Sequence, residues 1–87
     1  MSALDAATVE RAVTTFIVDN FLFGNAADAP ARDASFMETG LIDSTGVLEV
    51  VAHLESTYGI KVDDAELLPE NLDSIARIAA FVEKKKG

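Results

Sequence analysis

Three stretches of this 87-residue chain place apolar residues three or four positions apart, the spacing that gives an α-helix one apolar face. Together with a shorter apolar stretch they predict four helices, three longer and one short, at residues 5–22, 44–57, 74–85 and 65–68. Gly24 and Asn25 are expected to end the first helix, and Pro69 to end the short one. The predicted fold is therefore all-α: a small four-helix bundle with a long first loop. A chain of this length makes one domain, 1–87.

Each of the three longer helices is preceded by a residue type that caps helix N-termini well. These residues are Asp5 for the first, Asp43 for the second, and Asp73 or Ser74 for the last. A cap satisfies amides that have no partner within the helix, so these positions support the predicted helix starts.

The loop between the first two helices runs from Gly24 to Ile42, which is long for so small a domain. Loops beyond about 12–15 residues are uncommon and are usually functional or disordered. Phe36 and Met37 are expected to hold the end of this loop against the bundle, with a short helical turn near residues 33–38. The run Phe21–Phe23, at the start of the loop, is expected to fill the core.

The stretch Gly40-Leu41-Ile42-Asp43-Ser44 carries a strong local signal. Gly40 favours a turn, and the Asp43 carboxylate can accept hydrogen bonds from the first amides of the helix that follows. Ser44 then occupies the first helical position, with its hydroxyl beside the positive end of the helix dipole. That end of a helix favours a phosphate group. A hydroxyl at this place suits the attachment of a group through a phosphodiester.

The run Phe36-x-x-x-Gly40-Leu41-Ile42-Asp43-Ser44 resembles the prosthetic-group attachment site of acyl and peptidyl carrier proteins, and the likeness is strong from Phe36 to Leu54. In that family the serine after the aspartate carries 4′-phosphopantetheine. The resemblance therefore implies that Ser44 is the covalent attachment site, within a motif at residues 36–46. It also implies that Asp43 helps to hold magnesium while the attaching enzyme acts.

The resemblance further implies an acyl-carrier-like fold and a carrier rather than an enzyme. A phosphopantetheinyl transferase would move the arm from coenzyme A onto Ser44. An acyl or aminoacyl ligase would then load the cargo as a thioester, and acyltransferase-type enzymes would receive it. Thr45 and Gly46 stand where fatty-acid carriers usually have leucine and an acidic residue, and Ser56-Thr57 stands where they tend to be acidic. These departures favour a specialised, free-standing carrier for an unusual acyl or amino acid.

The outer face of the second predicted helix is expected to dock partner enzymes, through Thr45, Leu48, Glu49, Ala52 and Glu55. A single exposed leucine is ordinary in itself. Its place near the attachment serine, on an otherwise polar face, favours docking. Apolar cargo is expected to shelter between the Val47–Val51–Leu54 face and the other helices.

Fifteen acidic against seven basic residues give a net charge of −8, which argues against nucleic acid or an anionic membrane as partner and favours basic protein surfaces. There is no cysteine, which excludes disulfides and thiolate metal sites. No apolar run approaches the length of a membrane span, and the N-terminus has no basic segment followed by an apolar run. We therefore expect a monomer in the cytoplasm without a signal peptide.

Two alternatives compete with the carrier hypothesis. A hydrolase built on Ser44 would need a base, but His53 lies nine residues further along the same helix, about 13 Å away and on a different side. One histidine could not build a zinc site alone, and we predict no catalytic residue and no metal site. The other alternative is a small acidic helical adaptor that binds a protein partner without a cofactor. Such an adaptor needs no hydroxyl at position 44.

Overall fold

A computed structural model describes residues 5–86. Within that range the chain is helical and has no β-strand, which confirms the all-α prediction. Its α-helices are α1 (Ala6–Phe21), α2 (Phe36–Thr39), α3 (Ser44–Tyr58), α4 (Pro69–Leu72) and α5 (Ile75–Lys86). Two 3₁₀ turns, Ala26–Asp28 and Asp64–Glu66, lie in the connections. None of the helices between residues 5 and 86 is both long enough and apolar enough to cross a bilayer.

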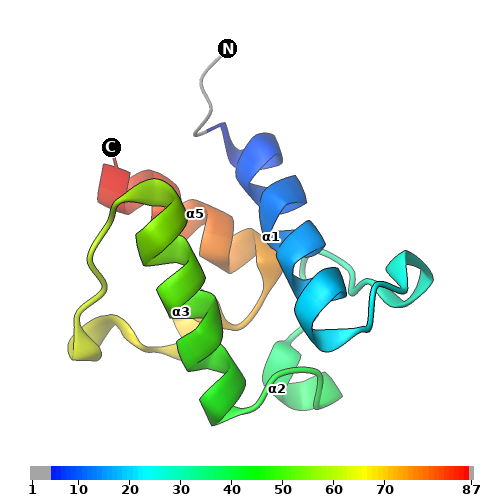
Figure 1. The fold of residues 1–87 in the computed structure, drawn as a ribbon. Helices are drawn as coiled ribbons and strands as arrows, with labels where there is room; N and C mark the ends of the chain where they lie inside the picture. Colours follow the sequence, from blue (N-terminus) through cyan, green and yellow to red (C-terminus); the bar gives the residue numbers. More distant parts are fainter. Residues whose placement is uncertain (1–4, 87) are drawn as a thin grey trace.

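The three longer helices enclose one apolar core, with α2 near the end of the bundle at which α3 begins (Figure 1). Helix α5 organises the packing, because α1, α3 and α4 all contact it. The side chains that become completely inaccessible to water come from all three longer helices and include Val9, Ile17, Leu54, Ile78 and Val82. Burial of these aliphatic groups is the main source of stability in so small a domain.

The predicted starts of the longer helices are confirmed by their caps. Asp5 and Asp43 each accept a hydrogen bond from a backbone amide in the first turn of the helix that follows. Before α5 the cap is Ser74, whose hydroxyl oxygen accepts a first-turn amide at 3.2 Å. Helix α3 ends at Tyr58, and Gly59 follows with a φ of 66°. This left-handed conformation is common directly after a helix and is usually adopted by glycine.

The prediction that Pro69 ends a short helix at residues 65–68 is wrong. Pro69 is the first residue of α4, and ahead of it only the turn Asp64–Glu66 is helical. Proline suits a first helical position because that position needs no amide partner and proline presets φ. Leu68 is extended, with φ −116° and ψ 147°, as residues before proline prefer.

The long first loop is fastened to the bundle by several contacts. Phe36 is buried, as predicted, whereas the Met37 side chain is half exposed and does not anchor the loop. Further back, the Arg32 guanidinium donates two hydrogen bonds to the Glu10 carboxylate, at 2.9 and 2.8 Å. The Arg32 carbonyl also accepts the amide of Ala76 in α5 at 2.9 Å. The loop therefore follows a defined path between α1 and α5.

Phe23 contradicts the expectation that the run Phe21–Phe23 fills the core, because its side chain is fully exposed. Its φ is 54°, in the left-handed region that side chains other than glycine seldom adopt. Gly24 also has a positive φ, and its amide donates to the Val18 carbonyl at 2.8 Å. This sharp exit from α1 leaves the Phe23 ring in solvent. Of the run Phe21–Phe23, only Phe21 and Leu22 pack against the core.

Candidate functional site

Ser44 is exposed and is the first residue of α3. Asp43 directly before it is extended, and its Oδ1 accepts the amide of Gly46 at 2.8 Å. The chain reaches this point through Gly40, whose φ of 72° ends α2, and Ile42, which is buried in the core. The start of α3 is thus anchored by the buried Ile42 side chain before it and by the Asp43 cap, while Ser44 is exposed.

Gly46 allows the first turn of α3 to approach its neighbours closely. A Cβ at this position would lie 2.8 Å from Ile42 Cγ2 and 3.0 Å from Phe21 Cε1. Ile42 is buried and β-branched, so it has little freedom to move aside. A glycine costs a helix about 1 kcal/mol relative to alanine. The close packing of this turn offsets that cost and explains why glycine stands here instead of an acidic residue.

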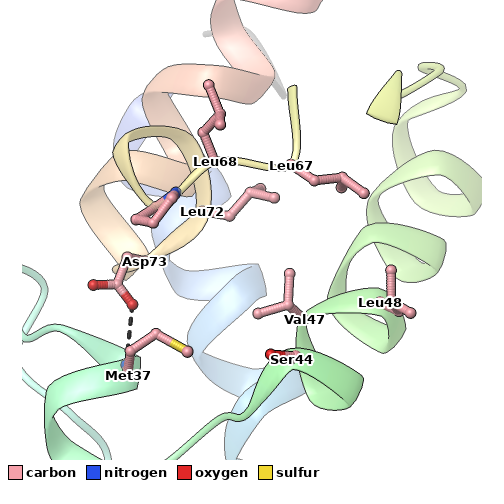
Figure 2. A pocket seen from close by; sticks show the side chains of 9 residues that line it. Met37, Ser44, Val47, Leu48, Leu67, Leu68, Leu72 and Asp73 are labelled. Carbon is pink, nitrogen blue, oxygen red and sulfur yellow. Dashed lines mark hydrogen bonds between the residues drawn. The ribbon is translucent and has the colours of Figure 1, made fainter. Parts of the chain in front are cut away.

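An apolar pocket of about 330 Å³ opens beside Ser44. Its walls come from α2, the first turns of α3 and the segment around α4, through Met37, Ser44, Val47, Leu48, Leu67, Leu68, Pro69, Leu72 and Asp73. Figure 2 shows Ser44 and Met37 toward one end of the pocket and Leu67 and Leu68 toward the other. Met37, Leu48 and Leu68 are 50%, 56% and 42% exposed. An apolar group bound here would remove this surface from water.

The pocket differs from the shelter that the sequence predicted. Val47 lines it, but Val51 and Leu54 belong to the buried core, so the expected shelter along them is wrong. The sequence did not predict the opposite wall of the pocket, because Leu67 and the residues after it follow Ser44 by 23 or more positions and no local pattern links them to it. One signal could have indicated it: two successive leucines before a proline, in a segment too short to bury both.

The predicted docking residues do not all have the same surroundings. Thr45, Leu48, Glu49 and Ala52 are exposed on α3. Glu55 is half-buried, and its carboxylate accepts the backbone amide of Val62 at 2.9 Å. The structure therefore places four of the five on an exposed face, while the fifth also binds the connection that follows α3.

His53 is partly exposed, as predicted, and it contacts α1. Its imidazole stacks on the Phe16 ring, with ring centroids 4.0 Å apart, and its Nδ1 lies 3.4 Å from the Thr57 hydroxyl. Burial lowers the pKa of His53 below its ordinary value. This arrangement favours a neutral ring packed between helices.

The geometry of Ser44, its cap and the pocket agrees with comparisons to known proteins. A family model described as the phosphopantetheine attachment site matches residues 22–82. The chain belongs to this family. As a member, the carrier bears acyl or aminoacyl groups on a covalently attached 4′-phosphopantetheine arm. Carriers of this family are generally non-catalytic and work with partner enzymes such as transferases and ligases.

Curated relatives align with between 52% and 92% of the carrier. An acyl carrier protein of Akkermansia muciniphila is 35% identical over 80 residues, which are 92% of this chain and 95% of the relative. An acyl carrier protein of Thermotoga maritima is 40% identical over 45 residues, 52% of this chain and 53% of the relative. A D-alanyl carrier protein of Abiotrophia defectiva is 30% identical over 53 residues, 61% of this chain and 67% of the relative. No solved structure matches the carrier significantly.

Proposed function

We propose that Ser44 is the residue to which 4′-phosphopantetheine is attached, and that residues 1–87 form a single carrier domain with its attachment motif at 36–46. The observation that carries this proposal is the exposed Ser44 hydroxyl on the first residue of α3, at the edge of an apolar pocket. A phosphodiester at this oxygen lies beside the positive end of the helix dipole, which stabilises its negative charge. The residues present therefore fit the group that the family carries.

In the attachment step, the Ser44 oxygen forms a bond to the coenzyme A phosphorus nearest the pantetheine. The pyrophosphate bond on the far side of that phosphorus breaks, and adenosine 3′,5′-bisphosphate leaves. The Ser44 proton passes to a base of the transferase. Asp43 uses Oδ1 for the amide of Gly46, and its other oxygen is suited to the magnesium ion that accompanies the pyrophosphate.

The cargo is held as a thioester on the terminal thiol that the arm supplies. The pocket beside Ser44 suits an apolar acyl chain or the apolar part of the arm, since Val47, Leu48, Leu67 and Leu72 line it. D-alanyl carrier proteins among the relatives support a small amino acid as a second class of cargo. In either case the flexible arm raises the effective concentration of the cargo at a partner's active site.

Partner enzymes dock on the exposed face of α3 around Ser44, formed by Thr45, Leu48, Glu49 and Ala52 with Glu55 at its border. The partners are a phosphopantetheinyl transferase, an acyl or aminoacyl ligase, and acyltransferase-type enzymes. The net charge of −8 steers the carrier to basic patches on these partners. The same acidity disfavours nucleic acid and anionic membranes.

We infer that the carrier acts as a cytoplasmic monomer and catalyses no reaction itself. A serine nucleophile needs a base within hydrogen-bond reach. The histidine on the same helix instead stacks on Phe16 and lies nine residues from Ser44. Its position supports a carrier and argues against a hydrolase.

The test is the intact mass of the protein after incubation with coenzyme A, magnesium and a permissive phosphopantetheinyl transferase. Wild type should gain one phosphopantetheine, and Ser44→Ala should gain none. Ser56→Ala alters another exposed serine of α3 and should gain the group like wild type. A gain that persists in Ser44→Ala would move the attachment elsewhere. No gain with several transferases, on protein shown to be folded, would favour the cofactor-free acidic adaptor.

A further inference from the structure

Asp73 lies between α4 and α5 but uses its side chain for neither helix. Its own amide donates to the Pro69 carbonyl at 3.0 Å and closes α4. The cap of α5 is Ser74, which accepts the amide of Arg77. The Asp73 carboxylate is thus left for contacts outside these two helices, at the border of the pocket that Ser44 also lines.

The carboxylate and carbonyl of Asp73 cap the start of α2. The Asp73 carbonyl accepts the amide of Phe36 at 2.8 Å, and Oδ1 accepts the amide of Met37 at 3.0 Å (Figure 2). Oδ2 accepts the hydroxyl of Ser35, whose oxygen in turn accepts the amide of Glu38 at 3.1 Å. The backbone amides in the first turn of a helix have no acceptors within that helix. Here Asp73, which lies 36 positions after Met37 and 38 after Ser35, provides acceptors.

Phe36 continues this connection toward Ser44. Its carbonyl accepts the amide of Leu41 at 3.0 Å and that of Ile42 at 3.4 Å. Ile42 is buried and lies two residues before Ser44. Phe36 therefore binds Asp73 through its amide and the turn before Ser44 through its carbonyl.

We propose that Asp73 is a positioning residue for Ser44, and this inference rests on the attachment at Ser44 proposed above. Its hydrogen bonds hold α2 against the junction of α4 and α5. This fixes the turn Gly40–Ile42 and the direction in which the Ser44 hydroxyl meets the transferase. A helix of one turn cannot hold its own conformation in water. Loss of the carboxylate should therefore loosen this turn while the core of α1, α3 and α5 stays packed.

Steady-state transfer kinetics test the inference, with one phosphopantetheinyl transferase, saturating coenzyme A and magnesium, and the carrier as the varied substrate. Asp73→Ala should lower kcat about tenfold, because small displacements of a reacting atom have large effects on rate. Asp73→Asn keeps an acceptor for the amide of Met37 and a polar partner for Ser35, so it should restore kcat to within about threefold of wild type. A carrier that is merely less stable offers fewer folded molecules, which raises the apparent KM and leaves kcat unchanged.

Glu10→Ala is the matched control. It removes a carboxylate that also accepts two hydrogen bonds, both from Arg32, and that joins α1 to the long loop without contacting α2. Its kcat should equal that of wild type. Ser35→Ala deletes the hydroxyl that donates to the Asp73 carboxylate and accepts the amide of Glu38, so it removes one link between Asp73 and α2. It gives a second reading if Asp73→Ala does not fold, and it should lower kcat by about threefold.

The outcomes separate the two proposals. If wild type is modified at Ser44 and Asp73→Ala has an unchanged kcat, the positioning role is overturned and the attachment site still stands. Ser35→Ala is used for the same comparison if Asp73→Ala does not fold. A reduced kcat in Glu10→Ala as well would also overturn it, because the effect would then not be specific to the start of α2. Absence of phosphopantetheine on Ser44 of wild type overturns the attachment proposal itself.

Discussion

The imidazole of His53 stacks on the ring of Phe16, with the two planes inclined by 17° and the ring centroids 4.0 Å apart. The contact joins the middle of α3 to α1. Phe16 also meets Phe21 edge to face, at a centroid distance of 6.2 Å. The histidine is therefore part of an aromatic cluster next to the turn that begins α3, and its protonation state affects how well the two helices pack.

We expect this stack to make stability depend on pH near neutrality. Burial lowers the pKa of His53 in the folded protein below the ordinary value of 6.5, so the unfolded chain binds the proton more readily. The stabilisation is complete above pH 6.5 and is lost as the pH falls through the lower pKa of the folded state. Urea unfolding of wild type and His53→Gln between about pH 7.5 and pH 5.5 measures it. Equal pH dependence in the two proteins would show that the stack contributes nothing.

Acidic residues should add a separate loss of stability at lower pH. The hydrogen bond from Arg32 lowers the pKa of Glu10, and the amide of Asp63 together with Lys85 lowers that of Glu66. Their contributions are complete above the ordinary value of 4.5 and are lost as the pH falls through the lower folded values. The histidine effect therefore lies in a different pH range from the carboxylate effects and can be measured apart from them.

Gly46→Ala should destabilise the carrier even though alanine is the better helix former. The gain in helix propensity is about 1 kcal/mol. The new methyl would lie 2.8 Å from Ile42 Cγ2, and overpacking of this kind costs about 1–3 kcal/mol. We therefore expect a net loss of about 1 kcal/mol in the free energy of unfolding, measured in urea. Ser56→Ala, at an exposed position of the same helix, is the control and should be neutral or slightly stabilising. A Gly46→Ala carrier more stable than wild type would contradict the close packing.

Phe23→Gly should raise stability. The wild-type residue has a φ of 54° and a fully exposed side chain, so it bears the strain of a left-handed conformation without any burial in return. Removing the strain gains about 1–2 kcal/mol, and the greater freedom of glycine in the unfolded chain returns about half of it. A rise of up to about 1 kcal/mol in the free energy of unfolding is the expected result. A fall of similar size would mean that the Phe23 ring makes stabilising contacts that its exposure does not show.

Local signals in the sequence predicted the parts of this fold that depend on neighbouring residues. The Asp43 cap and the first helical position of Ser44 each follow from residue type and a few adjacent positions. The apolar spacing likewise predicted the three longer helices to within one or two residues at most ends. The attachment motif was visible for the same reason, since it lies within the eleven consecutive residues 36–46.

Contacts between distant segments could not be predicted in this way. Either Asp73 or Ser74 was expected to cap the helix that follows; Ser74 does so, and the Asp73 carboxylate binds the start of α2 instead. Pro69 was expected to end a helix, and it instead occupies the first position of α4, which suits proline. The wall of the pocket opposite Ser44 depends on the same segment. In each case residue type allowed two local roles, and tertiary packing selected one.

Glu49 and Glu55 should separate docking from stability on the outer face of α3. Glu49 is exposed, so Glu49→Ala should change the free energy of unfolding by less than about 0.5 kcal/mol. The lost charge of Glu49 should lower kcat/KM with a basic transferase about twofold to threefold at low salt, and less at high salt.

Glu55→Ala deprives the partly buried Val62 amide of its acceptor and should cost about 1 kcal/mol of stability. Urea unfolding and transfer kinetics at two salt concentrations measure both effects. If Glu55→Ala slowed transfer as much as Glu49→Ala without any loss of stability, Glu55 would belong to the docking face, and its bond to Val62 would be incidental.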